Sequence, residues 1–421
     1  MKADSLIYNI KTLYTPIHEP PLRGANLRAI KELTNAYIAV KNGKIIAVGE
    51  TDYSQFLSPE TKKIDAKGKI ALPGFIDAHT HLVHAGSREE EFAAIQQGVP
   101  YLDILAGGGG IINTVSKTRA TSFVELLTQA RKSLNKMLSY GVTTIEAKSG
   151  YGLNLATEIK QLQVAQTLHQ QGPVHITSTY MGAHAIPLEH KKNPATYINS
   201  IIADLPTIKS LGYVDVVDVF CEKDVFSLSE TEKILTVAKN LGFKVRLHAD
   251  ELEALGGAGL GVKLEAISVD HLINISDKDI VKLGQSNTFA CLLPGTSFYL
   301  QKPFAKARMM IDNNVAVCVA GDYNPGSCPT ENFQLIMQLA ASYLKLSPEE
   351  VLNAVTINPA HLLNLSNQKG SLTPGKDADI LLLDAPNLAY IMYHFGINHV
   401  NDVFIKGKQV VKNKRIEGET K

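Results

Sequence analysis

Eight short apolar segments that alternate with helical patterns constrain the fold of this chain more than any other feature. They lie between residues 68 and 367, and each has the length of a buried strand. Their ranges are 69–76, 143–148, 174–181, 213–220, 244–249, 266–270, 288–293 and 315–320. Eight strand–helix units in about 300 residues are the number expected for an α/β fold of the TIM-like (β/α)8 barrel type. A doubly wound parallel sheet is the alternative, and a count of eight strands makes it less attractive.

Sequence patterns at helix starts support this alternation. Glu125 follows Ser122 at the spacing of a capping box, and the apolar residues behind it recur at helical spacing as far as Gly141. Ser229 and Glu232 form a second pattern of this kind. We therefore expect one helix to begin after each of these two serines.

The two ends of the chain differ from the middle and predict a second, smaller unit. Residues 36–48 contain two β-branched runs around Asn42-Gly43, which is a strong hairpin signal, and the C-terminal stretch has similar strand patterns. We expect the two ends to form one small β-sandwich domain, and the middle to form the barrel domain. The expected ranges are 1–67 with 368–421 for the sandwich, and 68–367 for the barrel.

The composition is that of an ordinary soluble protein and excludes several classes of function. Hydrophobic residues make up 45% of the 421 residues and charged residues 20%. The 42 Lys and Arg against 41 Asp and Glu give a net charge of +1, so neither nucleic acid nor a membrane surface is indicated as a partner. No apolar run reaches the about 18 residues of a membrane span. Three cysteines lie in apolar strand-like runs, which is typical of a reducing compartment, so we expect a cytoplasmic protein: Cys221, Cys291 and Cys318.

Polar residues at the ends of the predicted strands indicate a metal site. His79 and His81 follow the first strand, and in an extended backbone side chains at i and i+2 leave on the same face. His248 ends the fifth strand and Asp322 follows the eighth. Because the C-terminal strand ends of a barrel meet at one face, we expect these four residues to hold one divalent ion, Zn²⁺ or Fe²⁺. Such an ion lowers the pKa of a bound water toward about 7, and Asp322 would accept that water's proton.

Longer motifs in the same region resemble a known family. The run P-G-F-I-D-A-H-T-H at 73–81, together with His248, His271 and Asp322, resembles the amidohydrolase superfamily. The tail at 370–380 is similar to the return of that superfamily to its β-sandwich. More narrowly, the chain resembles the imidazolonepropionases, which act in histidine degradation, in several stretches: 79–88, 107–112, 146–153, 181–184 and 322–327.

This resemblance implies a small-molecule substrate, 4-imidazolone-5-propanoate, whose cyclic amide is hydrolysed to N-formimidoyl-L-glutamate. Arg88 is the candidate for a bidentate pair with the propionate carboxylate. Tyr151 is implied as a substrate contact, and its flanking glycines suggest an exposed loop tip. Tyr101, which precedes a glycine-rich flap at 107–110, is a further contact. A turn after the eighth strand adds polar groups for the ligand, from Asn324, Gly326 and Ser327.

Four residues are the candidates for catalysis under this resemblance. Besides Asp322 as the base, His184 would polarise the ring carbonyl. Glu251 would bond a ring N–H or protonate the departing nitrogen, and His271 would orient the water or stabilise the developing oxyanion. We interpret Lys148 as electrostatic support rather than as a bridging ligand.

Other interpretations remain open from the sequence alone. The pattern H-x-x-E at 248–251 also suits an aminohydrolase that deaminates a purine, pyrimidine or triazine ring. A non-catalytic barrel used as a scaffold is disfavoured because all four ligand candidates are present. Taken singly, Arg88 is equally compatible with a surface ion pair and His271 with a core histidine. The resemblance further implies a homodimer, and the ligand set does not decide between Zn²⁺ and Fe²⁺.

Overall fold

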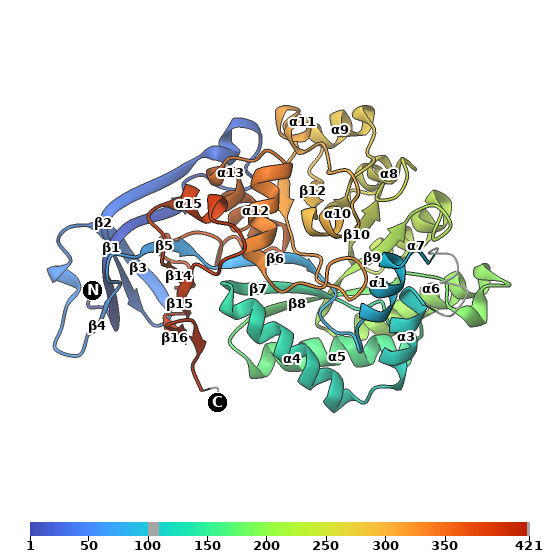
Figure 1. The fold of residues 1–421 in the computed structure, drawn as a ribbon, viewed down its shortest axis with the longest axis horizontal. Coiled ribbons are helices and arrows are strands. Elements are labelled where there is room, and N and C mark those ends of the chain that lie inside the picture. Colours follow the sequence, from blue (N-terminus) through green and yellow to red (C-terminus); the bar gives the residue numbers. More distant parts are fainter. Residues whose placement is uncertain (100–108, 419–421) are drawn as a thin grey trace.

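A ring of parallel strands forms the centre of the molecule and confirms the predicted barrel. The computed structural model describes residues 1–99 and 109–418. Its eight-stranded sheet follows the chain order, with helices on the outside (Figure 1). The strands are β6 (Phe75–Thr80), β7 (Val142–Lys148), β8 (His175–Ala183), β9 (Val214–Cys221), β10 (Lys244–Ala249), β11 (Ser268–His271), β12 (Phe289–Leu292) and β13 (Val317–Val319).

The ring closes between β6 and β13 at the residues that the sequence analysis assigned to the metal. The Asp322 N–H donates to the His79 carbonyl at 2.9 Å, and the His81 N–H donates to the Tyr323 carbonyl at 2.9 Å. Backbone hydrogen bonds therefore hold the strand-one and strand-eight ligand candidates next to each other. Closure of the barrel and assembly of the site depend on the same short segments.

The first strand candidate, 69–76, is wrong as a single barrel strand. It divides into β5 (Ile70–Pro73), which belongs to the terminal sheet, and β6, which belongs to the barrel. At the division, the Gly74 N–H donates to the Asp379 carbonyl of the terminal sheet at 3.0 Å. Both pieces are buried throughout, so hydrophobicity does not show where one ends. The other seven candidates agree with β7–β13 to within two residues at each end.

Helices connect the barrel strands and cover the ring. They are α1 (Glu89–Gln96), α3 (Ile111–Ala120), α4 (Phe123–Ser139), α5 (Leu155–Gln171), α6 (Pro194–Ser210), α7 (Leu228–Asn240), α8 (Gly257–Lys263), α9 (Asp277–Gly284), α10 (Pro294–Tyr299), α11 (Ala307–Asp312), α12 (Phe333–Tyr343), α13 (Pro348–Ala354), α14 (Ile357–Leu362) and α15 (Leu388–Tyr393). Three short 3-10 helices lie at Gly24–Arg28, Ser54–Phe56 and Leu188–His190.

One predicted helix start is confirmed and the other is displaced. Ser122 and Glu125 form a capping box ahead of α4. The box ahead of α7 uses Ser227 and Glu230, so the start predicted at Ser229 is wrong by two residues. Both serines in this segment have a glutamate three residues later, and the local pattern alone does not choose between them.

Strands from both ends of the chain form the second unit, a nine-stranded sheet. Its order is β17-β16-β15-β14-β5-β1-β2-β3, with β4 paired to β1. β5 links the two ends by pairing with β1 and β14, so the strands from both ends of the chain form one hydrogen-bonded sheet. The remaining strands are β1 (Ser5–Pro16), β2 (Ile30–Lys41), β3 (Lys44–Glu50), β4 (Lys62–Asp65), β14 (Ile380–Leu383), β15 (Val400–Ile405), β16 (Lys408–Lys412) and β17 (Arg415–Ile416).

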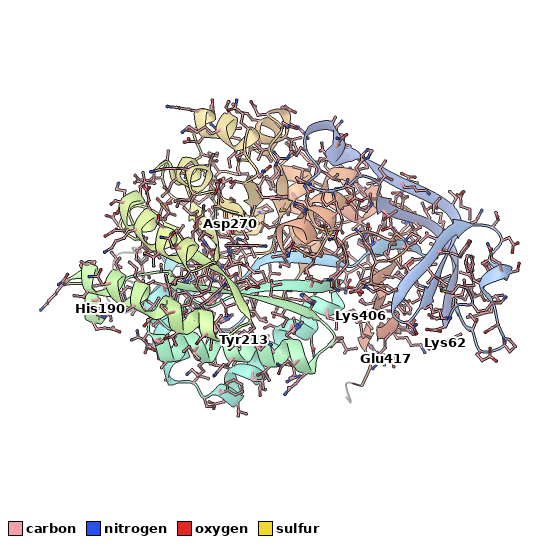
Figure 2. The ribbon with its side chains drawn as sticks, turned by 180° about the vertical axis from the view of Figure 1, so that it is seen from behind. Lys62, His190, Tyr213, Asp270, Lys406 and Glu417 are labelled. Atoms are coloured by element: carbon pink, nitrogen blue, oxygen red, sulfur yellow. The ribbon has the colours of Figure 1, made fainter. Side chains whose placement is uncertain are left out.

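The two units occupy opposite ends of the molecule. From behind, Asp270 lies among the barrel strands, whereas Lys62 and Glu417 lie at the terminal sheet (Figure 2). Side chains from β1, β2 and β3 share one core cluster with those of β14 and β15. None of the helices in the described parts of the chain is long and apolar enough to cross a bilayer.

Candidate active site

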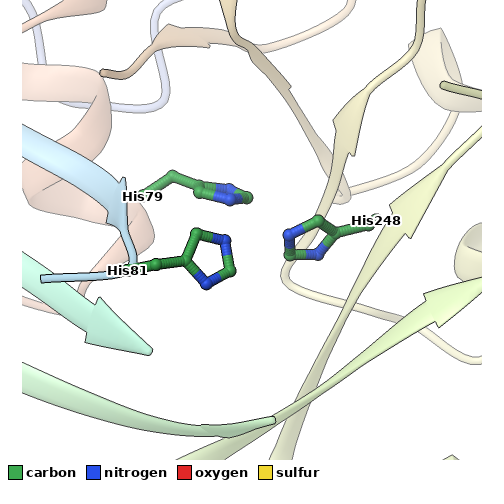
Figure 3. Close-up of side chains that lie close together, drawn as sticks. All are labelled: His79, His81 and His248. Atoms are coloured by element: carbon green, nitrogen blue, oxygen red, sulfur yellow. The ribbon is translucent and has the colours of Figure 1, made fainter. Parts of the chain in front are cut away.

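Three histidines from two strands converge at the C-terminal end of the barrel. His79 lies in β6, His81 follows it, and His248 lies in β10 on the facing side of the ring (Figure 3). One nitrogen from each ring lies within 4.8 Å of the others. All three side chains are buried. The sequence therefore predicted correctly that these residues come together.

The rings of His79 and His248 are held in the state that a metal ligand needs. The Nδ1–H of His79 donates to Asp270 at 2.7 Å, and that of His248 donates to Asp218 at 3.1 Å. In both rings Nε2 is buried and makes no hydrogen bond among the described residues. Burial holds the pKa of His79 well below its usual range, so this ring is neutral at neutral pH. A neutral imidazole with a free Nε2 lone pair is the form that binds divalent metals.

Asp322 completes the cluster from the end of β13. Its Oδ1 lies 3.4 Å from Nε2 of His79 and 3.6 Å from Nε2 of His81. The Thr296 hydroxyl donates to Oδ2, the other carboxylate oxygen. Burial raises the pKa of Asp322 to about 6. Because Oδ2 is bonded to Thr296, Oδ1 is the carboxylate oxygen that faces the histidines.

These residues fit a single divalent ion. Two orphaned Nε2 atoms, a third imidazole and a carboxylate oxygen meet in one buried place, and nitrogen with oxygen donors suits Zn²⁺ and Fe²⁺. His271 lies at the edge of the cluster, because it groups with His79 and Asp322 within the same 4.8 Å limit. The structure thus brings His271 next to His79 and Asp322.

Glu251 and His271 form a pair beside this cluster. His271 Nε2 lies 3.5 Å from Glu251 Oε2. Burial raises the pKa of Glu251 to about 8, and the nearby carboxylates of Asp322 and Glu222 add to the rise. Glu222 also accepts the Glu251 N–H at 3.1 Å, which fixes the backbone of this segment. Glu251 is therefore protonated at neutral pH and can act as a proton donor.

His184 and Tyr151 form the wall next to His81. The His184 ring stacks on His81 with centroids 4.9 Å apart and an interplanar angle of 15°. Its Nδ1–H donates to the Gly150 carbonyl at 3.0 Å. The ring centroids of Tyr151 and His184 are 5.2 Å apart, and Tyr151 is only 4% exposed. The prediction that Tyr151 lies at an exposed loop tip is therefore wrong. A Cβ on Gly150 would lie 2.8 Å from His184 Nδ1, which shows that this glycine serves close packing.

The loop that carries Tyr151 is fixed by the first turns of α5. The Glu158 carboxylate accepts the N–H groups of Gly150, Gly152 and Leu153 at 2.8–2.9 Å. Gln161 accepts the Tyr151 N–H at 3.2 Å. Sequence reasoning missed both residues, although Glu158 is buried and a glutamate six residues beyond K-S-G-Y-G was visible in the chain.

Arg88 lies against the turn that follows Asp322. Its Nε donates to Glu91 at 2.9 Å, and among the described residues its two Nη groups make no hydrogen bond. The Arg88 Nη1 lies 2.2 Å from where a Cβ on Gly326 would be. Asn324 Oδ1 accepts the N–H groups of Gly326 and Ser327, at 2.8 and 2.7 Å. These N–H groups are thus used within the turn, and what the turn offers is a close-fitting surface for Arg88.

Tyr101 and the first half of the glycine-rich stretch, at 107–108, lie outside the described residues. The predicted substrate contact from Tyr101 stays a prediction.

Comparison with known proteins places this chain in a family. The model of the amidohydrolase family matches residues 70–410. The chain belongs to the amidohydrolase family. An imidazolonepropionase of Fusobacterium nucleatum subsp. nucleatum is 48% identical over 98% of this chain and all of the relative. An imidazolonepropionase of Caldanaerobacter subterraneus subsp. tengcongensis is 50% identical over 98% of this chain and 99% of its own length.

Solved structures share the fold of this amidohydrolase at low sequence identity. An adenosine deaminase from Xanthomonas campestris with bound zinc has a TM-score of 0.71 at 17% identity, covering 100% of this chain and 95% of its own. The guanine deaminase of E. coli has a TM-score of 0.72 at 14% identity, covering 97% of this chain and 99% of its own. Identities this low show the fold alone, so the likeness does not favour deamination.

The sequence analysis of this amidohydrolase missed the charged residues beneath the histidines. Asp218, Arg246 and Asp270 lie inside β9, β10 and β11, and each is fully buried. A signal was present, because a charged residue within an otherwise apolar strand is rarely buried without a partner. What the sequence did not show is which partner each of them meets.

Proposed function

We propose that this amidohydrolase opens the ring of 4-imidazolone-5-propanoate by hydrolysing its cyclic amide C–N bond, giving N-formimidoyl-L-glutamate. The observation that carries the proposal is the match to imidazolonepropionases at 46–50% identity over at least 96% of the chain. The geometry supports it, since a buried cluster suited to a metal lies beside an arginine suited to a carboxylate.

We propose that His79, His81, His248 and Asp322 hold one Zn²⁺ or Fe²⁺ ion. When bound, a divalent ion polarises a carbonyl and lowers the pKa of water in the site. The Asp322 carboxylate is then the base that takes a proton from the attacking water, because its Oδ1 faces the cluster. Burial in this water-poor place strengthens each of these interactions.

The residues around the ion are proposed to position the water, contact the substrate and supply a proton. His271 holds the attacking water in place through its free ring nitrogen. The single ring proton of the neutral His184 is donated from Nδ1 to the Gly150 carbonyl, so its Nε2 can accept a hydrogen bond from a substrate N–H near His81, and the predicted polarisation of the ring carbonyl would need a second ring proton. Glu251, protonated at neutral pH, delivers its proton to the ring nitrogen as the C–N bond breaks. Asp322 then returns the proton taken from water to Glu251, directly or through solvent, so both groups regain their starting states.

Arg88 and Tyr151 are proposed to set the substrate's orientation. The pKa of the Tyr151 phenol is raised mainly by burial, with the Asp322 charge adding to this rise and the Arg88 charge opposing it. Tyr151 therefore lies within electrostatic reach of both charges, and its ring centroid is 5.8 Å from that of His81. A substrate with its amide at the cluster and its carboxylate at the Arg88 Nη groups would pass along the tyrosine ring.

Three other expectations are retained as proposals. The domain division at 67/68 and 367/368 is supported by the presence of two sheets, although β5, at 70–73, lies on the barrel side of the division and pairs within the terminal sheet. The buried free thiols of Cys221, Cys291, Cys318 and Cys328 support a reducing, cytoplasmic setting. A homodimer is proposed from the family resemblance alone.

The direct test is the loss of imidazolone propionate absorbance when purified protein is added, with and without a chelator. We expect turnover that stops with the chelator and returns with added Zn²⁺ or Fe²⁺. Release of ammonia from guanine or cytosine, with no turnover of imidazolone propionate, would contradict the proposal and favour a deaminase.

A further inference from the structure

The barrel carries a network of five buried charges directly beneath the histidine cluster. Each side chain is at most 1% exposed, and each comes from a different position on β7, β9, β10 or β11: Glu146, Lys148, Asp218, Arg246 and Asp270. Buried charges on this scale are costly unless they are paired and hydrogen-bonded. Their arrangement therefore needs a physical reason.

One arm of the network runs from Lys148 to His248. The Lys148 Nζ donates to Asp218 Oδ2 at 2.7 Å, and Asp218 Oδ1 accepts from His248 Nδ1 at 3.1 Å. Asp218 thus uses one oxygen for the lysine and the other for the histidine. The lysine fixes the carboxylate, and the carboxylate fixes the imidazole.

A second arm runs from Arg246 to His79. The Arg246 Nη2 donates to Asp270 Oδ2 at 2.7 Å, and the same oxygen accepts from His79 Nδ1 at 2.7 Å. Arg246 Nη1 also donates to the Ala78 carbonyl at 2.9 Å, next to His79 in the chain. The Ser268 hydroxyl donates to Asp270 Oδ1 at 2.6 Å, so every oxygen of this carboxylate is used.

Glu146 joins the two arms, because it lies 3.0 Å from Lys148 Nζ and 3.0 Å from Arg246 Nη1. With two cations and three carboxylates, the network carries a net charge of −1 when all five groups are ionised. Asp322 adds one further negative charge above it. These six groups together carry two negative charges when all are ionised, which a divalent cation would balance.

We infer that Lys148 and Arg246 are positioning residues for the metal, each acting through one carboxylate that orients one histidine ligand. A carboxylate at Nδ1 keeps the proton there, leaves the lone pair on Nε2, and makes that nitrogen a better donor to a metal. The cation beneath it hydrogen-bonds the carboxylate and holds it in place. The inference rests on the proposed metal site but not on the identity of the substrate.

The test is the affinity of the whole chain for Zn²⁺, measured by chelator competition without substrate, on Lys148→Met. Loss of outer partners of this kind weakens metal binding by about 10–100-fold, and we expect a loss in that range. The Co²⁺-loaded protein should also change its visible absorption, because the His248 ring is no longer held. Zn²⁺ affinity equal to that of the parent would overturn the inference.

Lys369→Met is the matched control. Lys369 is likewise buried and contacts two carboxylates, Asp379 at 2.5 Å and Asp377 at 3.4 Å, but it lies by the terminal sheet. We expect this variant to lose stability and to keep the parent's Zn²⁺ affinity and Co²⁺ spectrum. An equal loss of affinity in the control would show that Lys148 acts through general stability, and would overturn the inference.

Asp218→Asn tests the carboxylate through which Lys148 is inferred to act, and this single variant does not depend on whether Lys148→Met folds. If the lysine acts through Asp218, Asp218→Asn and the double variant Lys148→Met/Asp218→Asn should bind Zn²⁺ with the same reduced affinity. Parent-like affinity in either variant would contradict the inference. If the parent itself binds no divalent ion, the proposed metal site fails. If it binds the ion but does not open imidazolone propionate, only the proposed substrate fails.

Discussion

Three histidines of the site each hydrogen-bond a neighbour through Nδ1, and the kind of neighbour differs among them. The buried Nδ1 of His81 has no hydrogen-bond partner among the described residues. His79 and His248 donate to carboxylates, Asp270 and Asp218. His184 donates to a backbone carbonyl instead. A charged acceptor makes the opposite nitrogen a stronger metal donor than a neutral carbonyl does. The hydrogen-bond partners thus favour His79 and His248 as ligands and His184 as a substrate contact.

Gly326→Ala should weaken substrate binding through Arg88. The new methyl group would occupy the place of Arg88 Nη1, which lies 2.2 Å from the ideal Cβ position. Because the guanidinium is the flexible end of its side chain, it should move at little cost to stability. A charge-assisted hydrogen bond contributes about 1.5–3 kcal/mol, so we expect KM to rise at least about tenfold with kcat nearly unchanged. Steady-state kinetics with imidazolone propionate measure this.

Arg88→Ala provides the comparison for this variant. It should raise KM by a similar or larger factor, and the double variant with Gly326→Ala should be no worse than Arg88→Ala alone. If KM is unchanged in Arg88→Ala, the arginine does not bind the carboxylate and its assigned role is wrong.

The raised pKa of Glu251 predicts how kcat changes with pH on the alkaline side. Its pKa is raised to about 8, chiefly by burial, so the carboxyl holds its proton below that pH and loses it above. A group that donates a proton in the reaction must be protonated, and kcat should therefore fall as pH rises through about 8. Glu251→Gln should have a much lower kcat and no limb in that region. An alkaline limb that persists near pH 8 in Glu251→Gln would assign it to another group.

At the scale of elements, α5 determines the shape of the loop between β7 and α5. Glu158 accepts three backbone N–H groups of this loop and thereby holds Tyr151 against His184. Glu158→Gln keeps the shape of the side chain but turns an acceptor into a donor. An unsatisfied buried donor costs about 1–3 kcal/mol, so we expect the free energy of unfolding to fall by that amount. Urea unfolding measures this change.

The same Glu158→Gln variant should also lower kcat/KM, because Tyr151 and the Gly150 carbonyl that holds His184 both move with the loop. Thr157→Ala, next to Glu158 on α5, is a suitable control, since its side chain makes no hydrogen bond to the loop in the described structure. A loss of stability with unchanged kcat/KM would show that the loop does not position the substrate.

The start of a helix could be predicted from the sequence where one capping pattern was present, and could not where two such patterns overlapped. Ser122 had no rival as a cap, and its helix starts where predicted. Ser227 and Ser229 both matched the capping pattern, and burial of the following helix face, which the pattern does not contain, selects Ser227. The glycines beside Tyr151 suggested exposure, yet they are needed because His184 and α5 approach too closely for a side chain.

At the scale of the whole molecule, the barrel followed from the count of strands, and the position of its candidate metal cluster followed from the polar residues at the strand ends. The division of 69–76 between two sheets did not, because a continuous apolar run is compatible with either sheet. The pairing of the buried charges beneath the histidines could not be predicted from the sequence either. Lys148 and Asp218 lie 70 positions apart in the chain, and only closure of the ring brings them together.

The buried charges inside the barrel connect the stability of the molecule with the proposed metal site. The negative charge of the network and Asp322 would be balanced by a divalent ion, and three of the four proposed ligands lie where β6 and β13 close the ring: His79, His81 and Asp322. Binding of the ion to the folded chain alone should therefore stabilise the molecule, by about 4 kcal/mol when free ion is 1,000 times its Kd. Thermal unfolding with and without chelator should show a lower Tm for the metal-free protein.

The most direct measurement of the account is the metal content per chain, by elemental analysis, together with imidazolone propionate turnover, in the parent and in His248→Ala. The account predicts about one Zn²⁺ or Fe²⁺ per active parent chain, and loss of both metal and activity in His248→Ala. An active parent chain without a stoichiometric divalent ion, or a His248→Ala variant that loses its metal and keeps full activity, would contradict it.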